Sequence, residues 1–385
     1  GAGVMVRAVW LDAGPGRVGR VVLVVHHLAV DGVSWRVLLP DLQAACEAAA
    51  AGRQPELDPT GTSFRRWADL LTEQARSSER RAELDEWTAL LRHGEPTLGR
   101  RPLDPAQDTA GTLRRRSWTV PADRSATLTA ATTALFHCGV HEVLLATLAG
   151  AVAHWRPGGP ADVLVDVEGH GREPVEGVDL SRTVGWFTSS HPVRLSAGDT
   201  DLDAALAGLP AAGDLLKAVK EQAQAVPGDG LGYELLRHLN PETAPVLAAL
   251  PSPQIGFNYL GRFTAGTRTG PVGPWQLAGD TALGGAVDPA MPAMHALDAT
   301  AVVTDTPEGP ELTITLGWPA ALLTDDEAEE LGRIWLDLLV GLAAHTTDPA
   351  AGGHTPSDFP LLELGQDEVD ELEAIAQELD GGRSL

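Results

Sequence analysis

Apolar and polar positions along the first quarter of the chain predict a strand hairpin followed by helices. Residues 4–11 and 20–25 are rich in β-branched side chains and flank a Gly-Pro-Gly turn, which predicts two paired strands. Residues 35–50 are rich in alanine and predict a helix, for which Ser34 is the expected N-cap. Apolar residues at helical spacing predict two further helices, over residues 64–75 and 81–91.

The rest of the chain alternates strand and helix signals. The clearest helix is 141–155, whose apolar stripe indicates core packing. Strands are predicted over 113–120 and 162–167, a hairpin over 296–305 and 311–317, and helices over 122–133 and 325–344. This mixture of strands and helices predicts an α/β protein.

One segment is the best candidate for a linker. Residues 94–112 are rich in Pro, Gly and Asp, as connecting segments often are. We therefore expect two parts, residues 1–112 and residues 113–385. Because the chain enters a strand almost at once and does not begin with Met, we expect the first part to be the remainder of a larger lobe.

Composition and charge exclude several classes of partner. The 53 acidic and 28 basic residues give a formal charge of −25, which would repel nucleic acid phosphates. No apolar run reaches membrane-spanning length and no leader opens the chain, so we expect a cytoplasmic protein with no membrane partner. Cys46 and Cys138 are too few for a disulfide framework and are expected to be buried thiols.

Three arginine runs could form local basic patches on this acidic chain. They are residues 80–81, 100–101 and 114–116. We expect each run to be a solvated surface that offsets neighbouring carboxylates.

The first chemical candidates follow the second strand, in the sequence HHLAVDGVSW at 26–35. Neighbouring strand residues point to opposite faces, so only one of His26 and His27 can face a given cavity, and the other is structural. Asp31 can hold an imidazole or an arginine, and Gly32 is expected to let the backbone turn. The alternative is a core histidine pair bonded to backbone carbonyls, and for a lone histidine that interpretation would be preferred.

The pattern HHxxxDGxSW resembles the signature of the condensation and epimerization domains of non-ribosomal peptide synthetases, a superfamily related to chloramphenicol acetyltransferase. The resemblance makes His27 the candidate acid/base group and His26 structural. It implies a two-lobed α/β fold of the chloramphenicol acetyltransferase-like (condensation-domain-like) type, with mixed sheets and a cleft between lobes. Members of this family carry further strands and helices before the histidine motif, so we expect this sequence to lack the amino-terminal part.

A second motif narrows the resemblance. The sequence EGHGRE at 168–173 resembles the epimerization-domain signature, whereas condensation domains tend to carry a different, Gly-Arg-centred sequence. Its two glycines permit a tight turn, Glu168 supplies a carboxylate, and Arg172 can bond a carboxylate bidentately. Asp31 is the expected partner of Arg172, although Arg182 competes for that role. Taken alone, Glu168 would be better interpreted as a partly exposed surface acid in a Gly-rich loop.

Three more motifs follow in the order of the family. TVGWFTS at 183–189 precedes His191, where the family more often has Tyr. PGDGLGY at 227–233 and FNYLGRF at 257–263 resemble the remaining two signatures. The Gly-Asp-Gly sequence at 228–230 lacks the preceding strand and the spacing of a phosphate-binding loop, so we reject a nucleotide site.

The resemblance implies L-to-D epimerization at Cα of an aminoacyl or peptidyl thioester. Inversion removes a proton from one face of Cα and returns one to the other, which requires two acid/base groups. His27 and Glu168 are the expected pair, and Glu168 needs a pKa raised by burial or like charge. Asn258, Tyr259 or a protonated His27 are the candidates for stabilising the enolate-like intermediate.

The expected partner is a carrier protein domain that presents the substrate on its 4′-phosphopantetheine arm, together with neighbouring synthetase modules. We expect no cofactor on this chain and no metal, because its His and acidic residues lack ligand spacing. One alternative is a condensation domain that forms amide bonds with the same His27, against which EGHGRE and FNYLG argue. Another alternative is a catalytically silent carrier-docking domain.

Overall fold

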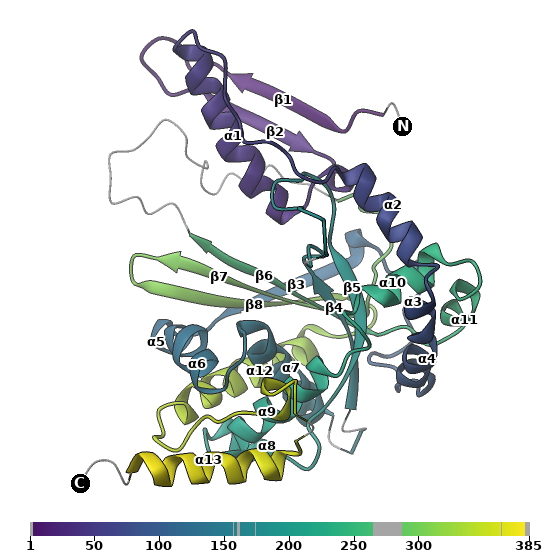
Figure 1. Ribbon diagram of the computed structural model, residues 1–385, viewed down its shortest axis with the longest axis vertical. Helices are drawn as coiled ribbons and strands as arrows, with labels where there is room; N and C mark the ends of the chain where they lie inside the picture. Colours follow the sequence, from purple (N-terminus) through teal and green to yellow (C-terminus); the bar gives the residue numbers. More distant parts are fainter. Residues whose placement is uncertain are drawn as a thin grey trace.

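A six-stranded mixed sheet forms the centre of the computed structural model, which describes residues 3–156, 158–159, 162–173, 175–264, 287–362 and 364–381 (Figure 1). The strand order is β3-β8-β7-β6-β4-β5. The strands are β3 (Leu113–Thr119), β4 (Asp162–Gly169), β5 (Ser189–Ser196), β6 (Ile255–Thr264), β7 (Leu297–Thr306) and β8 (Gly309–Pro319). The β4–β6 and β6–β7 pairs are parallel and the other three are antiparallel, so the predicted α/β class with a mixed sheet is confirmed.

Helices on one side of the sheet build the main core (Figure 1). The predicted helix at 141–155 is α7 (Val140–Trp155), whose apolar residues are buried as its pattern indicated. It packs against α12, where the Trp335 indole donates a hydrogen bond of 3.1 Å to Thr147. The other helices of this group are α5 (Ala122–Ala126), α6 (Thr133–Leu135), α8 (Leu202–Leu206), α9 (Ala211–Gln224) and α12 (Asp325–His345), and α13 (Gln366–Gly381) lies beyond them, farther from the sheet. A π-helical turn, Thr127–Thr132, joins α5 to α6, so the helix predicted at 122–133 is not uniformly α-helical.

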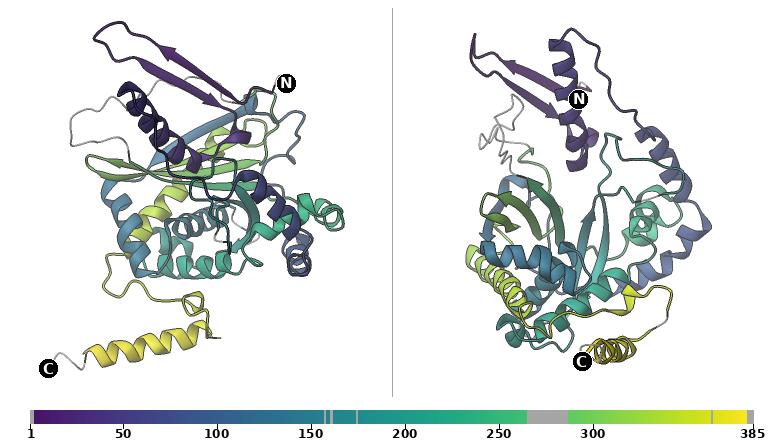
Figure 2. Two further views of the ribbon diagram at one scale, coloured as in Figure 1. Left: turned by 45° about the horizontal axis from the view of Figure 1, so that its top comes forward. Right: turned by 60° about the vertical axis from the view of Figure 1, so that its left-hand side comes forward.

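The amino-terminal elements lie over the opposite side of the sheet (Figures 1 and 2). The predicted hairpin is present as β1 (Val6–Leu11) and β2 (Arg20–Val25), paired antiparallel. A 3-10 turn, η1 (His27–Ala29), leads into α1 (Gly32–Ala50). Most apolar side chains of the hairpin are exposed.

Helices from the first predicted part pack against the second. They are α2 (Phe64–Gln74), α3 (Ser78–Ala82) and α4 (Leu84–Arg92), and they lie beside α10 (Leu231–Glu234), the π-helical turn η4 (Leu235–Leu239) and α11 (Ala244–Ala248). Trp87 and Leu91 are fully buried against Leu164 and Tyr233. The division at residue 112 therefore stays a prediction, and contacts cross it extensively.

The predicted linker is held to the body of the protein. The Leu98 amide donates to the Gln254 side chain at 2.8 Å, and Asp108 is buried in an ion pair with Arg101 at 2.6 Å. Residues 94–112 therefore act as an ordered connection across the sheet.

The start of α1 differs from the prediction. Asp31 is the N-cap, because its carboxylate accepts from the Ser34 amide at 2.7 Å, and Ser34 is the third helical residue. Gly32 is the first helical residue and has no positive φ, so the expected need for its backbone freedom is wrong.

The two thiols differ in exposure. Cys46 is exposed, which corrects the expectation of a buried thiol, because it lies on the outer face of α1. Cys138 is half-buried, and burial raises its pKa to about 12.

Within the part of the chain that the structure describes, no single helix is long and apolar enough to cross a membrane. One bent pair of helices, Ala122–Leu135 with Val140–Trp155, has the length and composition of a membrane span when the two are taken together.

Candidate functional site

A buried ion pair joins the histidine motif to the EGHGRE motif. Arg172 Nη2 lies 3.2 Å from each carboxylate oxygen of Asp31, and the two side chains are only 8% and 5% exposed. The same guanidinium donates to the carbonyl oxygens of Leu180 and Thr183, and it lies 3.9 Å from the centre of the Phe187 ring. Arg172 thus connects the histidine motif, 141 residues away in sequence, to the 180–187 segment that follows it.

Asp31 is itself the centre of a hydrogen-bond network. Its carboxylate accepts from the Ser34 amide and hydroxyl, both at 2.7 Å, and from the Phe187 amide at 3.2 Å. Burial would raise the pKa of Asp31, but the bonds from Ser34, the charge of Arg172 and the Phe187 bond outweigh it and lower the pKa. The Asp31 carboxylate therefore stays ionised at neutral pH.

The competing arginine has a different partner. Arg182 Nη2 lies 2.7 Å from Asp41 on α1, and Nη1 lies 3.8 Å from Asp58. Of the two arginines considered as partners of Asp31, Arg172 is the one that pairs with it.

Only the second glycine of EGHGRE is in a turn that requires glycine. Gly171 has φ +62°, and a Cβ there would lie 1.6 Å from the Phe187 carbonyl oxygen. Gly169 is the last residue of β4 and has no positive φ. The tight approach of Gly171 brings Arg172 under the 180–187 segment.

The two adjacent histidines lie on the exposed turn between β2 and α1. His26 caps this turn, since its Nδ1 accepts from the Leu28 amide at 3.2 Å. The His27 ring lies 5.1 Å from the ring of Trp186, which belongs to the TVGWFT motif. Because both imidazoles are exposed, they do not form the core pair that was the alternative.

Glu168 lies within β4, not beyond its end as predicted. The strand continues to Gly169 because Glu168 pairs with Ser190 of β5. On the other side, the Asn258 side-chain amide on β6 donates to Glu168 Oε2. Glu168 is therefore held between two strands of the sheet, half-buried, rather than in an exposed loop.

The surroundings of Glu168 raise its pKa above the ordinary value of 4.5. Burial is the largest cause, and the like charge of Asp166 adds to it. The charges of His295 and His27 act in the opposite direction. His27 and Glu168, which come from different motifs, are thus within electrostatic range of each other.

Neighbouring residues on β6 have different surroundings. Asn258 bonds Glu168, whereas Tyr259 packs against the main hydrophobic core, where burial raises its pKa. This is the result expected for a strand whose successive side chains alternate. Of the two candidates on β6 for stabilising an intermediate, Asn258 is the one that contacts Glu168.

Sequence reasoning missed three charged residues beside Glu168. His295 lies 3.1 Å from Asp166 and 3.0 Å from Asp298, using one ring nitrogen for each carboxylate. The period of two along β4 places Asp166 on the same face as Glu168, which was a usable signal. His295 lies outside the strands and carried no such signal.

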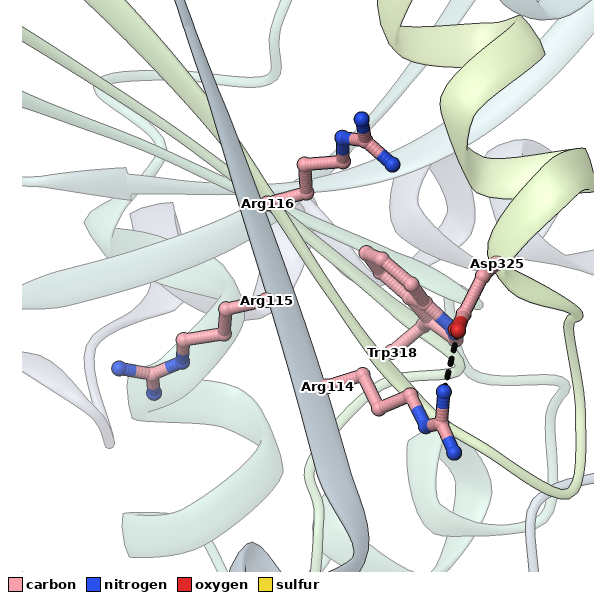
Figure 3. A pocket seen from close by; sticks show the side chains of 5 residues that line it. All are labelled: Arg114, Arg115, Arg116, Trp318 and Asp325. Atoms are coloured by element: carbon pink, nitrogen blue, oxygen red, sulfur yellow. Dashed lines mark hydrogen bonds and ion pairs between the residues drawn. The ribbon is translucent and has the colours of Figure 1, made fainter.

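The arginine runs have carboxylate partners, but Arg80 is largely buried between Glu83 and Asp229, so the expected solvated surface is wrong for that residue. Arg114, Arg115, Arg116, Trp318 and Asp325 surround a cavity of about 370 Å3 beside β3 (Figure 3). Arg114 is paired with Asp325 there, and Arg116 with Glu329 at 2.5 Å. None of the predicted site residues lines this cavity.

Comparison with known proteins finds similar sequences over nearly the whole chain. The family described as "Condensation domain" matches residues 6–359. One of the subunits of linear gramicidin synthase from Brevibacillus parabrevis is 36% identical over 371 residues, which are 96% of this chain and 5% of that protein. Tyrocidine synthase 1 of Brevibacillus parabrevis is 30% identical over 356 residues, 91% of this chain and 31% of that protein. The chain therefore spans less than a third of the length of these relatives.

Solved structures support the same assignment. The epimerization domain from the third module of tyrocidine synthetase B matches with a TM-score of 0.69 and 29% identity, over 85% of this chain and 69% of that one. The first condensation domain of the calcium-dependent antibiotic synthetase has the same fold, with a TM-score of 0.57 and 21% identity over 90% of this chain and 68% of that one. The two-lobed, condensation-domain-like fold expected from the motifs is confirmed, and the chain belongs to the condensation domain family.

Proposed function

We propose that this chain epimerizes Cα of an aminoacyl or peptidyl thioester held on the 4′-phosphopantetheine arm of a carrier protein domain. The observation that carries the proposal is Glu168, a half-buried carboxyl with a raised pKa that opens EGHGRE and lies within electrostatic range of His27. The similarity to an epimerization domain, higher in identity and TM-score than that to the condensation domain above, supports the same choice.

In this mechanism His27 and Glu168 serve opposite faces of Cα. A neutral imidazole at His27 accepts the Cα proton, and the electron pair of the broken C–H bond moves into the thioester carbonyl to give an enolate. Protonated Glu168 then returns a proton from the other side, and the roles exchange for the reverse direction. Burial favours this role because it raises the population of protonated Glu168 near neutral pH.

Asn258 is the residue that we assign to the enolate oxygen. An amide side chain carries two N–H donors, and one of them is used by Glu168. The second N–H can donate to oxygen as negative charge develops on it, which lowers the barrier to proton removal.

The substrate would reach this chain from a partner. The curated relatives are synthetases several times longer than this chain, which supports a carrier domain and neighbouring modules as the partners. The thioester arm belongs to the carrier, so the chain itself supplies acid/base groups and needs no cofactor of its own.

The test is proton exchange at Cα in D2O. A carrier protein loaded with an aminoacyl-phosphopantetheine is incubated with the wild-type chain, His27→Ala or Glu168→Gln, and the released amino acid is analysed for deuterium and chirality. Exchange with inversion in the wild type, lost in both variants, is the expected result.

Two other results would overturn the proposal. Amide product with an added amine acceptor, and no inversion, would identify the condensation activity that the family description also covers. Binding of the loaded carrier without exchange or amide formation would identify a silent docking domain.

A further inference from the structure

A second ionic group lies beside Glu168 and has no role in the mechanism above. His295, just before β7, places Nε2 3.1 Å from Asp166 on β4 and Nδ1 3.0 Å from Asp298 on β7. Its side chain is 12% exposed. Because each ring nitrogen faces a carboxylate, both nitrogens act as donors and the imidazole carries a positive charge. Burial would lower the pKa of His295, but the bonds and charges of the two aspartates outweigh it and raise the pKa to about 9.

The sheet contains a space made for this imidazole. Gly256 on β6 lies between Asp166 of β4 and Asp298 of β7, and pairs with both. A Cβ at Gly256 would lie 2.3 Å from His295 Nδ1, so any other residue there would displace the ring. The missing side chain lets His295 bridge β7 and β4 across the strand between them.

Asp166, Gly256 and Asp298, together with the bridging His295, form one row across the sheet. Glu168 and Asn258 form the next row on the same face. Glu168 is two residues beyond Asp166 on β4, and Asn258 is two residues beyond Gly256 on β6, which is the spacing of side chains that share a face. The charges of the bridge therefore act on Glu168 from the adjacent row.

We propose that His295 is a positioning residue for Glu168: bonded to Asp166 and Asp298, it fixes the geometry and balances the charge of the neighbouring row. The inference rests on the proposed role of Glu168. Without His295, the charges of the two aspartates would be opposed at Glu168 by His27 alone among the groups of the described residues that act on its pKa.

The sign of the effect follows from the charged groups around Glu168. These are Asp166 on its own strand, Asp298 on β7, Glu234 on α10, and the two imidazoles His295 and His27. Loss of positive charge at position 295 makes Glu168 hold its proton more tightly and raises its pKa. Loss of the negative charge at position 166 has the opposite effect.

The first test follows Glu168 without any substrate. The Glu168 carboxyl is titrated by carbon-13 NMR, with Glu168→Gln to assign its signal. We expect the midpoint to rise by about one pH unit in His295→Gln, the size expected for removal of one nearby charge at an effective dielectric constant of about 20. In Asp166→Asn/His295→Gln, where one charge of each sign is removed, the midpoint returns toward the wild-type value.

A matched control is available in His354→Gln. His354 also bonds a carboxylate, that of Glu373 at 2.6 Å, but neither residue is among the groups that act on Glu168. This variant is expected to leave the Glu168 midpoint unchanged. If His295→Gln fails to fold, Asp166→Asn alone still tests the proposal, because it is expected to lower the midpoint.

The second test is the pH profile of Cα exchange. In His295→Gln the limb assigned to Glu168 is expected to move in the same direction as the NMR midpoint, with KM for the loaded carrier unchanged. An unshifted midpoint and profile in a folded His295→Gln would overturn the inference. Absence of exchange in the wild type would instead overturn the proposed function, while the NMR result would still report on His295.

Discussion

The two acid/base candidates lie in contrasting surroundings. His27 is on an exposed 3-10 turn between a hairpin and α1, where its ring contacts Trp186. Glu168 is inside a six-stranded sheet, bonded to Asn258 on the adjacent strand. The sheet sets both the position and the protonation of Glu168, whereas His27 depends on a loop anchored by Asp31.

This difference predicts that substitutions on the two sides of the site have different effects. On the loop side, the anchor is a buried ion pair, so damage there costs stability and misplaces His27. On the sheet side, the strands hold the backbone in place, so changes near Glu168 alter its pKa more than the fold.

Removal of either acid/base group is expected to have the greatest consequence. His27→Ala and Glu168→Gln should each reduce inversion by about 10²- to 10⁴-fold, the usual contribution of general acid–base catalysis. Chiral analysis of the carrier-bound product measures this loss. His26→Ala is the control, because His26 caps the turn and acts through folding. Full activity in Glu168→Gln would contradict a two-group mechanism.

The loop anchor is tested by comparing the loss of stability when the aspartate is removed from a buried ion pair and from a half-exposed one. Asp31→Ala leaves Arg172 buried and unpaired, which should cost about 3–5 kcal/mol in the free energy of unfolding. Asp41→Ala removes the half-exposed partner of Arg182 and should cost no more than about 1 kcal/mol. Urea unfolding of both variants measures the difference. Equal costs would mean that burial of the Asp31 pair is not what anchors the loop.

The pH dependence of stability should differ between the two sides. The folded-state pKa of Asp31 is below its ordinary value of 3.8, so its contribution is present above that pH and is lost as the pH falls below it. The folded-state pKa of His295 is raised from 6.5 to about 9, so its contribution is complete below pH 6.5 and is lost between pH 6.5 and about 9.

Thermal melts of wild type and His295→Gln from about pH 6 to about pH 9.5, a window that brackets both pKa values of His295, check the sheet side. The difference in melting temperature between the two proteins should be greatest at the acid end of this range and shrink toward the alkaline end. A difference that stays constant over this range would mean that folding does not raise the pKa of His295.

The least effect is expected at Gly32. A Cβ there meets open space and the residue is helical, so Gly32→Ala should be neutral or stabilise the protein by up to about 1 kcal/mol. Gly171→Ala is the contrasting variant, since its Cβ would overlap the Phe187 carbonyl oxygen at a positive φ, and it should destabilise the protein clearly. A large loss of stability in Gly32→Ala would restore the sequence-based expectation for that glycine.

Local patterns predicted many of the elements because they depend on neighbours in sequence, although the helix expected over 81–91 is divided between α3 and α4. The strand at 20–25 and the helix at 141–155 agree with β2 and α7 to within one residue at each end. The choice of N-cap was wrong because Asp31 and Ser34 are both good capping residues. The carboxylate of Asp31 takes the cap while it also binds Arg172, which lies 141 residues away in sequence.

Residue order and residue type were enough to specify the class of the fold, the family motifs and the candidacy of His27 and Glu168, since these are local properties of the chain. Three-dimensional folding was needed to establish that Arg172 and not Arg182 pairs with Asp31, and that Asp166, His295 and Asp298 form a charged row next to Glu168. The reason is physical: ion-pair partners and pKa values depend on distance and burial, and residues on paired strands are brought together by folding from positions far apart in the chain.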